Sequence, residues 1–426
     1  MLSQVLYRAT TSENGDAPPE QVRAYAIQLF SLSATKLADG LIDPKLILSW
    51  LLTSIGAPGG LIGALVPVRE AGSLLPQLAL ARVIEQRRQR KQVWAAGSAL
   101  QGLAALVIAW AVLFLDGAAA GWAVILALAV LACARSACSA SSKDIMSRTL
   151  EKGTRGSVSG SAGSAAAILI FAYAVLLGLG IIPREPKFIA LGVALAGALW
   201  ILAAVIFLRL KEPDADPDTS GFDSFAEVTR PLRHDPQFRS YLGVRALLVS
   251  TALAPPFLVL LSGTDQHGGL GNLGLFMIAS SLASILSSYV WGRLSDQSSR
   301  KTLAAAGLLS SACFAAAALL GIVSGGLGTL GLAAVFIFVA QVAYQGARQG
   351  RKTHLTDMDT PDGKATYTAL SNSLIGVLLL LGGGFGILAD YIGAAWILAI
   401  FAVMSLAALP VALGLNEVQH PDDADS

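Results

Sequence analysis

The sequence predicts an all-α polytopic membrane protein with twelve transmembrane helices, arranged as two six-helix pseudo-repeats. Three observations predict this fold. Of the 426 residues, 54% are apolar and only 14% are charged. The apolar residues form long runs, each close to the roughly 20 residues that a helix needs to cross a bilayer core. Lysine and arginine gather in alternate connections between the runs, and part of that pattern recurs about 210 residues later.

The apolar runs place six expected spans on each side of a polar joint. The first six are expected at about 28–50, 59–81, 94–115, 121–142, 157–180 and 188–209, and the second six at about 240–262, 270–291, 303–323, 327–347, 366–388 and 393–414. The predicted parts are an N-terminal tail (1–21), an N-terminal half (22–210), a central loop (211–238), a C-terminal half (239–415) and a C-terminal tail (416–426). This spacing leaves little chain for a soluble domain.

Charged side chains interrupt three of the first four spans. They are Lys36, Asp39 and Asp43 in the first span, Arg69 and Glu70 in the second, and Arg135 in the fourth. Each such charge costs roughly 2.5–3.5 kcal/mol on insertion scales, so it must pair or face a water-filled cavity. Residues three and four apart share a helix face, which predicts that the three charges of the first span lie together. Pro44 is expected to interrupt the helix beside them.

Two interpretations of these charges stay open. In the functional one, Asp39, Asp43 or Glu70 exchanges protons, with Asp43 favoured, while the cations hold an anionic substrate or tune the acid. In the structural one, the charges form permanent ion pairs, such as Lys36 with Asp39, that lock the helices together. Lys45 and Arg245, which also fall inside apolar runs, could instead extend to the membrane surface.

The loop charges predict the orientation of the chain. Lysine and arginine number 21 in and beside the connections after spans two, four, six, eight and ten, against Arg184 and Lys187 in the opposite connections. Because cytoplasmic loops carry the excess of positive charge, both termini are predicted in the cytoplasm, and the protein in the inner membrane.

The two halves share a weak internal similarity, which predicts a duplication. An offset of 210 places Arg90-Lys91 and Gly97 on Arg300-Lys301 and Gly307, and an offset of 209 places Lys143 on Lys352. Parallel six-helix repeats are a known transporter architecture, with the substrate path between the halves near mid-membrane. Chance similarity between runs rich in Ala, Gly and Leu is the alternative.

The connection after span eight carries a recognisable pattern. It reads Gly292-Arg-Leu-Ser-Asp296-Gln-Ser-Ser-Arg300-Lys301. The text resembles the cytoplasmic loop signature of the major facilitator superfamily, roughly G-x-L-x-D-R-x-G-R-K, although Gln297 and Ser299 replace the usual Arg and Gly. The expected roles are close helix approach at Gly292 and a gating latch in which Asp296 binds a helix N-terminus and a cation, Arg348 or Arg351.

The fourth span adds a partial match to the same family. Leu131-Ala-Cys-Ala-Arg135 resembles the pattern L-x-x-x-R followed by Q and G, but Cys138 and Ser139 occupy the last two positions. In that family the Arg is tied to proton coupling, so the resemblance makes Arg135 a candidate for that role. Glycines in spans five and eleven, including Gly178 and Gly382 to Gly386, are interpreted as packing or hinge residues.

These observations predict a secondary active transporter that moves a small solute by alternating access, coupled to protons and acting as a monomer. An uncoupled facilitator or lipid flippase of the same fold, and a non-transporting sensor or scaffold, are the alternatives. We expect no enzymatic activity, no cofactor and no metal, because the sequence has no phosphate-binding loop and its four histidines have no ligand-like spacing. We also expect no nucleic-acid partner, since the basic loops are explained as topology signals.

Overall fold

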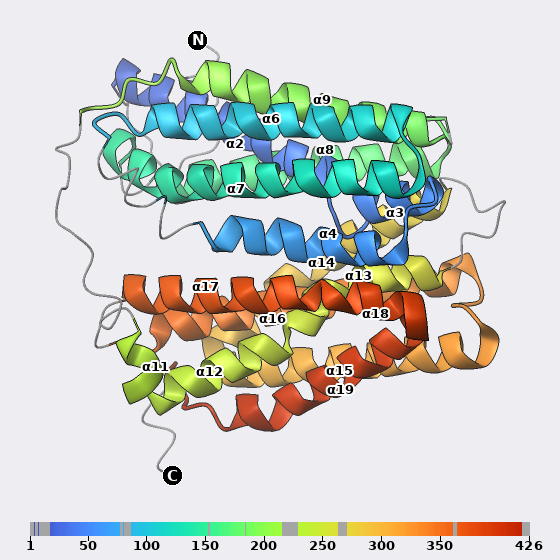
Figure 1. The fold of residues 1–426 in the computed structure, drawn as a ribbon. Coiled ribbons are helices and arrows are strands. Elements are labelled where there is room, and N and C mark those ends of the chain that lie inside the picture. The colour runs from blue at the N-terminus through green and yellow to red at the C-terminus, as the bar shows by residue number, and fades with distance from the viewer. Residues whose placement is uncertain are drawn as a thin grey trace. The chain divides into compact units, whose positions relative to one another are not determined.

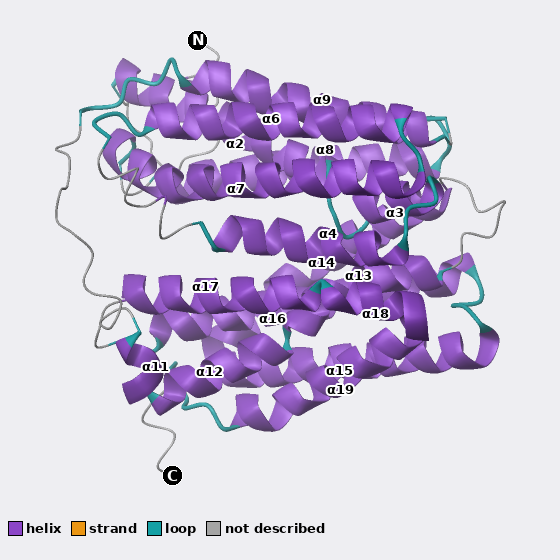
Figure 2. Ribbon diagram, viewed as in Figure 1, coloured by secondary structure: helices purple, strands orange, loops and turns teal. Residues whose placement is uncertain are grey.

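The structure is a computed structural model that describes residues 18–76, 87–151, 154–183, 185–214, 229–262, 271–360 and 364–419, together with residues 4, 7 and 80. Within these ranges all regular secondary structure is helical, as Figure 2 shows. Most of the predicted central loop, 215–228, lies outside the described residues. Ten helices in the described ranges are long and apolar enough to cross a membrane.

The chain divides into two compact units, each described here by itself. The first unit contains Met1–Asp43, Gly72–Tyr173 and Glu185–Gly221, and the second contains Pro44–Ala71, Ala174–Arg184 and Phe222–Ser426. Two segments of the predicted N-terminal half therefore group with the second unit. The predicted boundary between six-helix halves at 211–238 stays a prediction.

The helices of the first unit overlap the expected spans, although the first of them begins at Pro19, before the expected start at 28 (Figure 1). They are α2 (Pro19–Leu41), α6 (Lys91–Phe114), α7 (Gly117–Thr149), most of α8 (Arg155–Gly178) and α9 (Pro186–Phe207). Helices α6 and α9 run side by side. Their approach depends on Gly102 and Gly197, since a Cβ on either would lie within 3 Å of the other's carbonyl oxygen. Trp94 stacks on Phe207 with ring centroids 3.9 Å apart, near the end of the pair.

The second unit contains the remaining helices, some of them short. They are α3 (Ile47–Ser54), most of α4 (Gly59–Leu74), α11 (Arg230–His234), α12 (Pro236–Leu247), α13 (Val249–Leu261), α14 (Gly271–Gln297), α15 (Ser299–Ser324), α16 (Leu330–Asp357), α17 (Lys364–Gly382), α18 (Gly384–Ile392) and α19 (Ala394–Leu413). Helices α15 and α19 run side by side, as α6 and α9 do in the first unit. Phe238, Tyr241 and Tyr367 are buried at one end of this unit.

The first two expected spans differ most from the helices that form, while spans seven and eleven are divided only by single non-helical residues, Leu248 and Gly383. The first is split into α2 and α3 by the non-helical residues 42–46, as Pro44 predicted. The second corresponds to α4, which is helical for 16 residues.

Close glycine contacts join α4 to α18 inside the second unit. A Cβ on Gly63 would lie 2.4 Å from the Cα of Gly386, and a Cβ on Gly386 would lie 2.8 Å from the carbonyl oxygen of Gly60. The end of α8 meets α14 in the same way, since a Cβ on Gly274 would lie 2.5 Å from the nitrogen of Gly178. The interpretation of Gly178 and Gly386 as packing glycines is therefore confirmed.

Many large apolar side chains are exposed on the long helices. Examples are Phe114 (70% exposed), Leu319 (64%) and Tyr391 (83%). In a soluble protein apolar surface on this scale would cause association, whereas in a membrane it faces lipid.

Candidate functional site: buried charges within the helix bundles

In the first unit, the structure joins two of the predicted charges directly. Asp39 on α2 accepts an ion pair from Nη1 of Arg135 on α7. The two residues are 96 positions apart, and the ion pair links the first predicted span to the fourth. Lys36, one helical turn before Asp39, donates from Nζ to the backbone oxygen of Ser159 on α8 at 2.7 Å. Gly163 on α8 leaves room for this ammonium, because a Cβ there would lie 3.3 Å from Nζ.

A cavity of about 180 Å³ opens beside this ion pair, within the first unit. Lys36, Asp39 and Arg135 line it, together with polar groups from α6 and α7 that include Gln101 and Ser139. The side chains of Asp39 and Arg135 are 21% and 38% exposed, so both partners are within reach of water. The ion pair therefore lies inside the unit but at a cavity, where both side chains remain partly exposed.

Hydrogen bonds also join the residues that line the cavity from α6 and α7. Cys138 donates from Sγ to the backbone oxygen of Trp94, and Gln101 donates to the same sulfur at 3.3 Å. Gly97 lies against Cys138, since a Cβ there would come within 2.8 Å of Sγ. Cys138 occupies the position where the family pattern has Gln. The amide beside it comes instead from Gln101 of the neighbouring helix α6.

Asp43 lies in the break between α2 and α3 and is half-buried. The carbonyl of Pro44, freed by that break, accepts a hydrogen bond from the Ser49 hydroxyl at 2.7 Å. The prediction that Lys36, Asp39 and Asp43 share one continuous helical face is wrong for Asp43, because α2 ends at Leu41. The cause is Pro44, whose ring disfavours helical geometry at the residue before it.

Two further buried cations were not singled out by the sequence as site residues. Lys45 is 8% exposed and its ammonium lies 3.2 Å from the centroid of the Tyr344 ring. Arg245 is also 8% exposed and hydrogen-bonds to Ser371 and, at 2.9 Å, to Asn372. The alternative that these side chains extend to the membrane surface is therefore wrong. Their position inside apolar runs was the signal that could have identified them.

Helix α4 brings Arg69 and Glu70 into the second unit. Arg69 is 8% exposed and Glu70 is half-buried. Glu70 interacts electrostatically with Arg245 of α12. In the part of the chain that the structure describes, Nε of Arg245 is buried and has no hydrogen-bond partner. The hydrogen bonds that orient the guanidinium therefore come from the uncharged Ser371 and Asn372, and Glu70 is an acid that interacts with its charge.

The loop signature between α14 and α15 is arranged differently from the expectation. Asp296 is exposed, and neither it nor Arg348 nor Arg351 forms a side-chain ion pair within the described residues. The N-terminus of α15 is capped instead by Ser298, whose hydroxyl accepts from the nitrogen of Lys301. Arg300 pairs with Glu417 at 3.0 Å. The latch at Asp296 stays a prediction for another conformation.

Gly292 does not serve the close helix approach expected of it. A Cβ at this position would meet no atom within 4 Å among the described residues. The helix contact occurs at the preceding residue, where the Trp291 ring lies against Gly346 of α16 and its indole nitrogen donates to the backbone oxygen of Val342. In this conformation the expectation for Gly292 is wrong, because α16 approaches the neighbouring face of α14.

Comparison with solved structures shows that this arrangement of helices is similar to that of two transporters. A crystal structure of a mutant of the nucleoside transporter NupG matches with a TM-score of 0.66 and 14% identity, covering 92% of this chain and 99% of that one. A POT family transporter in complex with a thioalcohol-conjugated peptide matches with a TM-score of 0.70 and 12% identity, covering 92% and 96%. The chain has the major facilitator fold.

The predicted fold class, all-α and polytopic, is therefore confirmed, and the protein is a multi-pass membrane protein. No protein-family model matches the chain, and no curated protein matches it in sequence. At 12–14% identity the major facilitator likeness concerns the fold, so the substrate must be argued from the site itself.

Proposed function

We propose that the protein is a proton-coupled secondary active transporter that works by alternating access, with Asp39 as the proton-binding group. The observation that carries the proposal is the Asp39–Arg135 ion pair, which spans two helices and lines a cavity. Protonation of Asp39 removes its charge and releases Arg135, so a single proton changes the bonding between α2 and α7. Asp39 ranks ahead of Asp43, which the sequence favoured, because the ion pair of Asp39 joins two helices beside a cavity.

The buried charges also support a substrate class. Eight charged side chains (Asp, Glu, Lys or Arg) lie well inside the predicted spans: Lys36, Asp39, Asp43, Lys45, Arg69, Glu70, Arg135 and Arg245. Five are cations and three are acids, which leaves an excess of two positive charges whichever way they pair. Uncompensated charge is costly in a low-dielectric interior, so a negatively charged ligand would be favoured there. We therefore propose that the solute is an anion.

Arg245 is the strongest candidate for direct contact with that anion. Its guanidinium is oriented by Ser371 and Asn372, which are neutral, and its Nε has no partner in the described part of the chain. A guanidinium held in this way offers the planar fork that matches a carboxylate or phosphate. Lys45, covered by the ring of Tyr344, adds a second buried positive charge to the same unit.

The substrate class is tested by thermal unfolding of the purified protein with a panel of anionic and neutral metabolites. Ligands raise stability in proportion to ln(1 + [L]/Kd), so anions should dominate the hits. For each hit, Arg245→Gln should weaken binding, whereas Arg233→Gln, which changes an exposed arginine of α11, should not. A panel in which neutral compounds stabilise the protein and anions do not would refute the anionic substrate.

Coupling is tested with the identified solute in proteoliposomes. Asp39→Asn should abolish accumulation driven by a pH gradient while it spares exchange of solute for solute, because only the proton step is lost. Asp116→Asn is the matched control, since Asp116 is an exposed acid at the start of α7. Full gradient-driven accumulation by Asp39→Asn, Asp43→Asn and Glu70→Gln alike would make the cluster structural and refute the proposed proton site. No gradient-driven accumulation in the wild type, with solute movement retained, would make the protein an uncoupled facilitator or flippase.

The absence of any solute movement in the wild-type protein would favour the sensor or scaffold alternative.

The predicted orientation of the chain is tested by labelling introduced cysteines. Cysteines introduced at 184–187 should react with an impermeant reagent from outside, and those at 87–91 or 297–299 only after permeabilisation. Inside-only labelling at 184–187 would reverse the predicted topology.

A further inference from the structure

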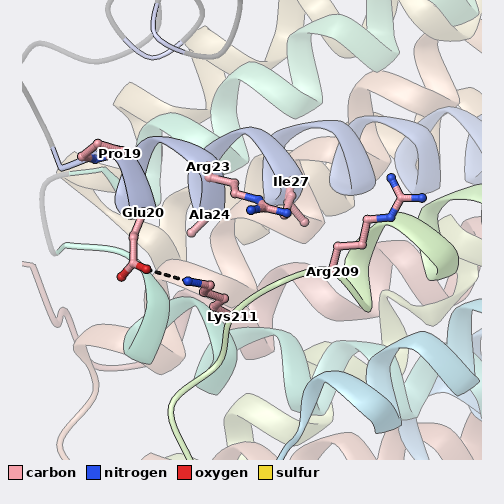
Figure 3. Close-up of a pocket in the computed structure, with 7 residues that line it drawn as sticks. All are labelled: Pro19, Glu20, Arg23, Ala24, Ile27, Arg209 and Lys211. Carbon is pink, nitrogen blue, oxygen red and sulfur yellow. Dashed lines mark hydrogen bonds and ion pairs between the residues drawn. The ribbon is translucent and has the colours of Figure 1, made fainter.

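A second cavity of the first unit lies outside the charge cluster, at the N-terminal end of α2. Its volume is about 220 Å³, and it is lined by the first turns of α2 and by residues that follow α9. Figure 3 shows the charged residues that line it: Glu20 and Arg23 from α2, and Arg209 and Lys211 from beyond α9. This places four charged side chains at one end of two membrane helices that run side by side.

The charges of this cavity do not cancel. Glu20 accepts an ion pair from Lys211 at 2.7 Å, drawn as the dashed line in Figure 3. Arg23 and Arg209 are exposed, and neither has a hydrogen-bond or ion-pair partner among the described residues. Two guanidinium groups, from two different elements, therefore line one cavity, and no acid among the described residues pairs with either.

An exposed apolar face leads away from each arginine along its helix. On α2, Arg23, Ile27 and Phe30 follow one another at intervals of four and three residues, and Phe30 is 46% exposed. On α9 and the residues after it, Leu202, Val205 and Arg209 follow at intervals of three and four. Side chains at these intervals lie on one face of a helix. The apolar face of α2 therefore ends at Arg23, and that of α9 is followed by Arg209, just beyond the end of the helix at Phe207.

We propose that this cavity binds an anionic phospholipid, with the headgroup phosphate between Arg23 and Arg209 and the acyl chains along the exposed apolar faces of α2 and α9. The location favours a lipid over a soluble anion, because the cations stand where apolar, lipid-facing surface ends. Arginine presents paired donors that match phosphate oxygens. Basic cavities between membrane helices at the headgroup level are a known means of lipid recognition.

The leaflet is the one at the end of the membrane where α2 begins, which the distribution of lysine and arginine predicts to be cytoplasmic. The inference is independent of the transport activity, since its test needs neither a substrate nor a gradient. It concerns residues that no step of the proposed transport mechanism uses.

The test is thermal unfolding of the detergent-purified, delipidated full-length protein with added phosphatidylglycerol, phosphatidylcholine of the same acyl chains, or glycerol 3-phosphate. Phosphatidylglycerol should raise the melting temperature in a saturable manner, and the other two should not. The apparent affinity should fall as salt rises, because the contacts are between exposed charges. Equal stabilisation by both lipids would overturn the proposal, and stabilisation by glycerol 3-phosphate would reassign the cavity to a soluble phosphate.

Substitutions of Arg23 and Arg209 test whether the lipid binds at this cavity. Because each basic residue near a membrane surface contributes about 1 kcal/mol of attraction, Arg23→Gln and Arg209→Gln should each weaken phosphatidylglycerol binding about fivefold, and the double variant about 25-fold. Arg233→Gln, an exposed arginine of α11, is the control and should bind as the wild type does. Since Arg23 and Arg209 have no described partners, the variants should retain the wild-type melting temperature without lipid. Undiminished binding by the folded double variant would place the lipid elsewhere.

Discussion

In each of the two units, a glutamate binds at the N-terminus of a long helix, but the groups that it contacts there differ. In the first unit, α6 begins at Lys91 without a side-chain cap of its own. The carboxylate of Glu212, two residues beyond Leu210, accepts from the backbone nitrogens of Arg90 and Lys91 at 3.2 and 2.8 Å. The Lys91 ammonium donates to the carbonyl of Leu210. We call these residues the first clamp.

In the second unit, α15 begins at Ser299 and is capped by Ser298. The carboxylate of Glu417, two residues beyond Leu415, accepts from the Ser298 hydroxyl at 2.6 Å and from Arg300 at 3.0 Å. Arg300 also donates to the carbonyl of Leu415. These residues form the second clamp, in which the acid reaches the helix end through a hydroxyl and a guanidinium.

The two clamps keep the same geometry although their contacts differ. Each clamp joins the residues after one helix to the start of its neighbour, α9 to α6 and α19 to α15, through the pattern Leu-x-Glu. The position of Arg90-Lys91 on Arg300-Lys301, noticed at an offset of 210, therefore has a structural counterpart. In the first clamp the acid binds the helix end directly, so that clamp should depend more strongly on its acid.

The largest expected effect is on the first clamp. Glu212→Gln removes a charge that binds two N–H groups of a helix N-terminus at a site 7% exposed, and should lower the free energy of unfolding by about 2–3 kcal/mol. Glu417→Gln should cost about 1 kcal/mol, since Ser298 still caps α15. Thermal or denaturant unfolding in one detergent measures both. Glu185→Gln, in an exposed pair with Lys187, is the neutral control, and equal losses in the two clamps would contradict the comparison.

The two helix pairs should also differ in how well they tolerate a larger side chain at their contact. The α6–α9 pair should lose more stability than the α15–α19 pair. A Cβ on Gly102 would lie 2.6 Å from the backbone oxygen of Gly197, whereas a Cβ on Gly307 would lie 3.0 Å from that of Ser405. Gly102→Ala must move the α6 backbone and should cost about 1–3 kcal/mol, more than Gly307→Ala. Unfolding measurements on the two variants rank them, and Gly160→Ala, where a Cβ meets nothing within 4 Å of described structure, is the control.

The second clamp should weaken in acid. Burial acts to raise the pKa of Glu417, but the hydrogen bonds from Ser298 and Arg300 outweigh it and leave the pKa below its ordinary 4.5. Because the folded pKa is depressed, the stabilisation is complete above pH about 4.5 and is lost as the pH falls through the lower, folded value. The difference in melting temperature between the wild type and Glu417→Gln should be constant from pH 7 to 5 and shrink below pH 4.5. A gap that grows in acid would refute this.

The smallest expected effect on stability is at Asp296. Because Asp296 is exposed and has no described partner, Asp296→Asn should change the free energy of unfolding by less than about 0.5 kcal/mol. If the predicted latch forms when the transporter closes at this end, the same variant should slow transport. Unchanged transport kinetics would reduce the loop signature to a topology signal and leave the second clamp as the main contact there.

The sequence by itself determined the elements that depend on local chemistry. Long apolar runs specify helices that cross a bilayer, and the basic connections between them specify the predicted orientation, because both follow from transfer between water and lipid. Pro44 specified the break between α2 and α3 through the geometry of its own ring. The loop signature and Arg135 indicated the major facilitator fold, which the comparison with solved structures confirmed.

Only the tertiary structure decided which charges meet. Helical periodicity predicts neighbours on one helix, but it cannot predict which helix lies beside it, so the pairing of Asp39 with Arg135 was not foreseen. For the same reason, the sequence did not predict the contacts of Arg245 with α17 or of Lys45 with Tyr344. The exposure of Asp296, and the acids of the two clamps, also depend on where α9 and α19 end in space. Packing between helices, rather than any property of a single run, determines those positions.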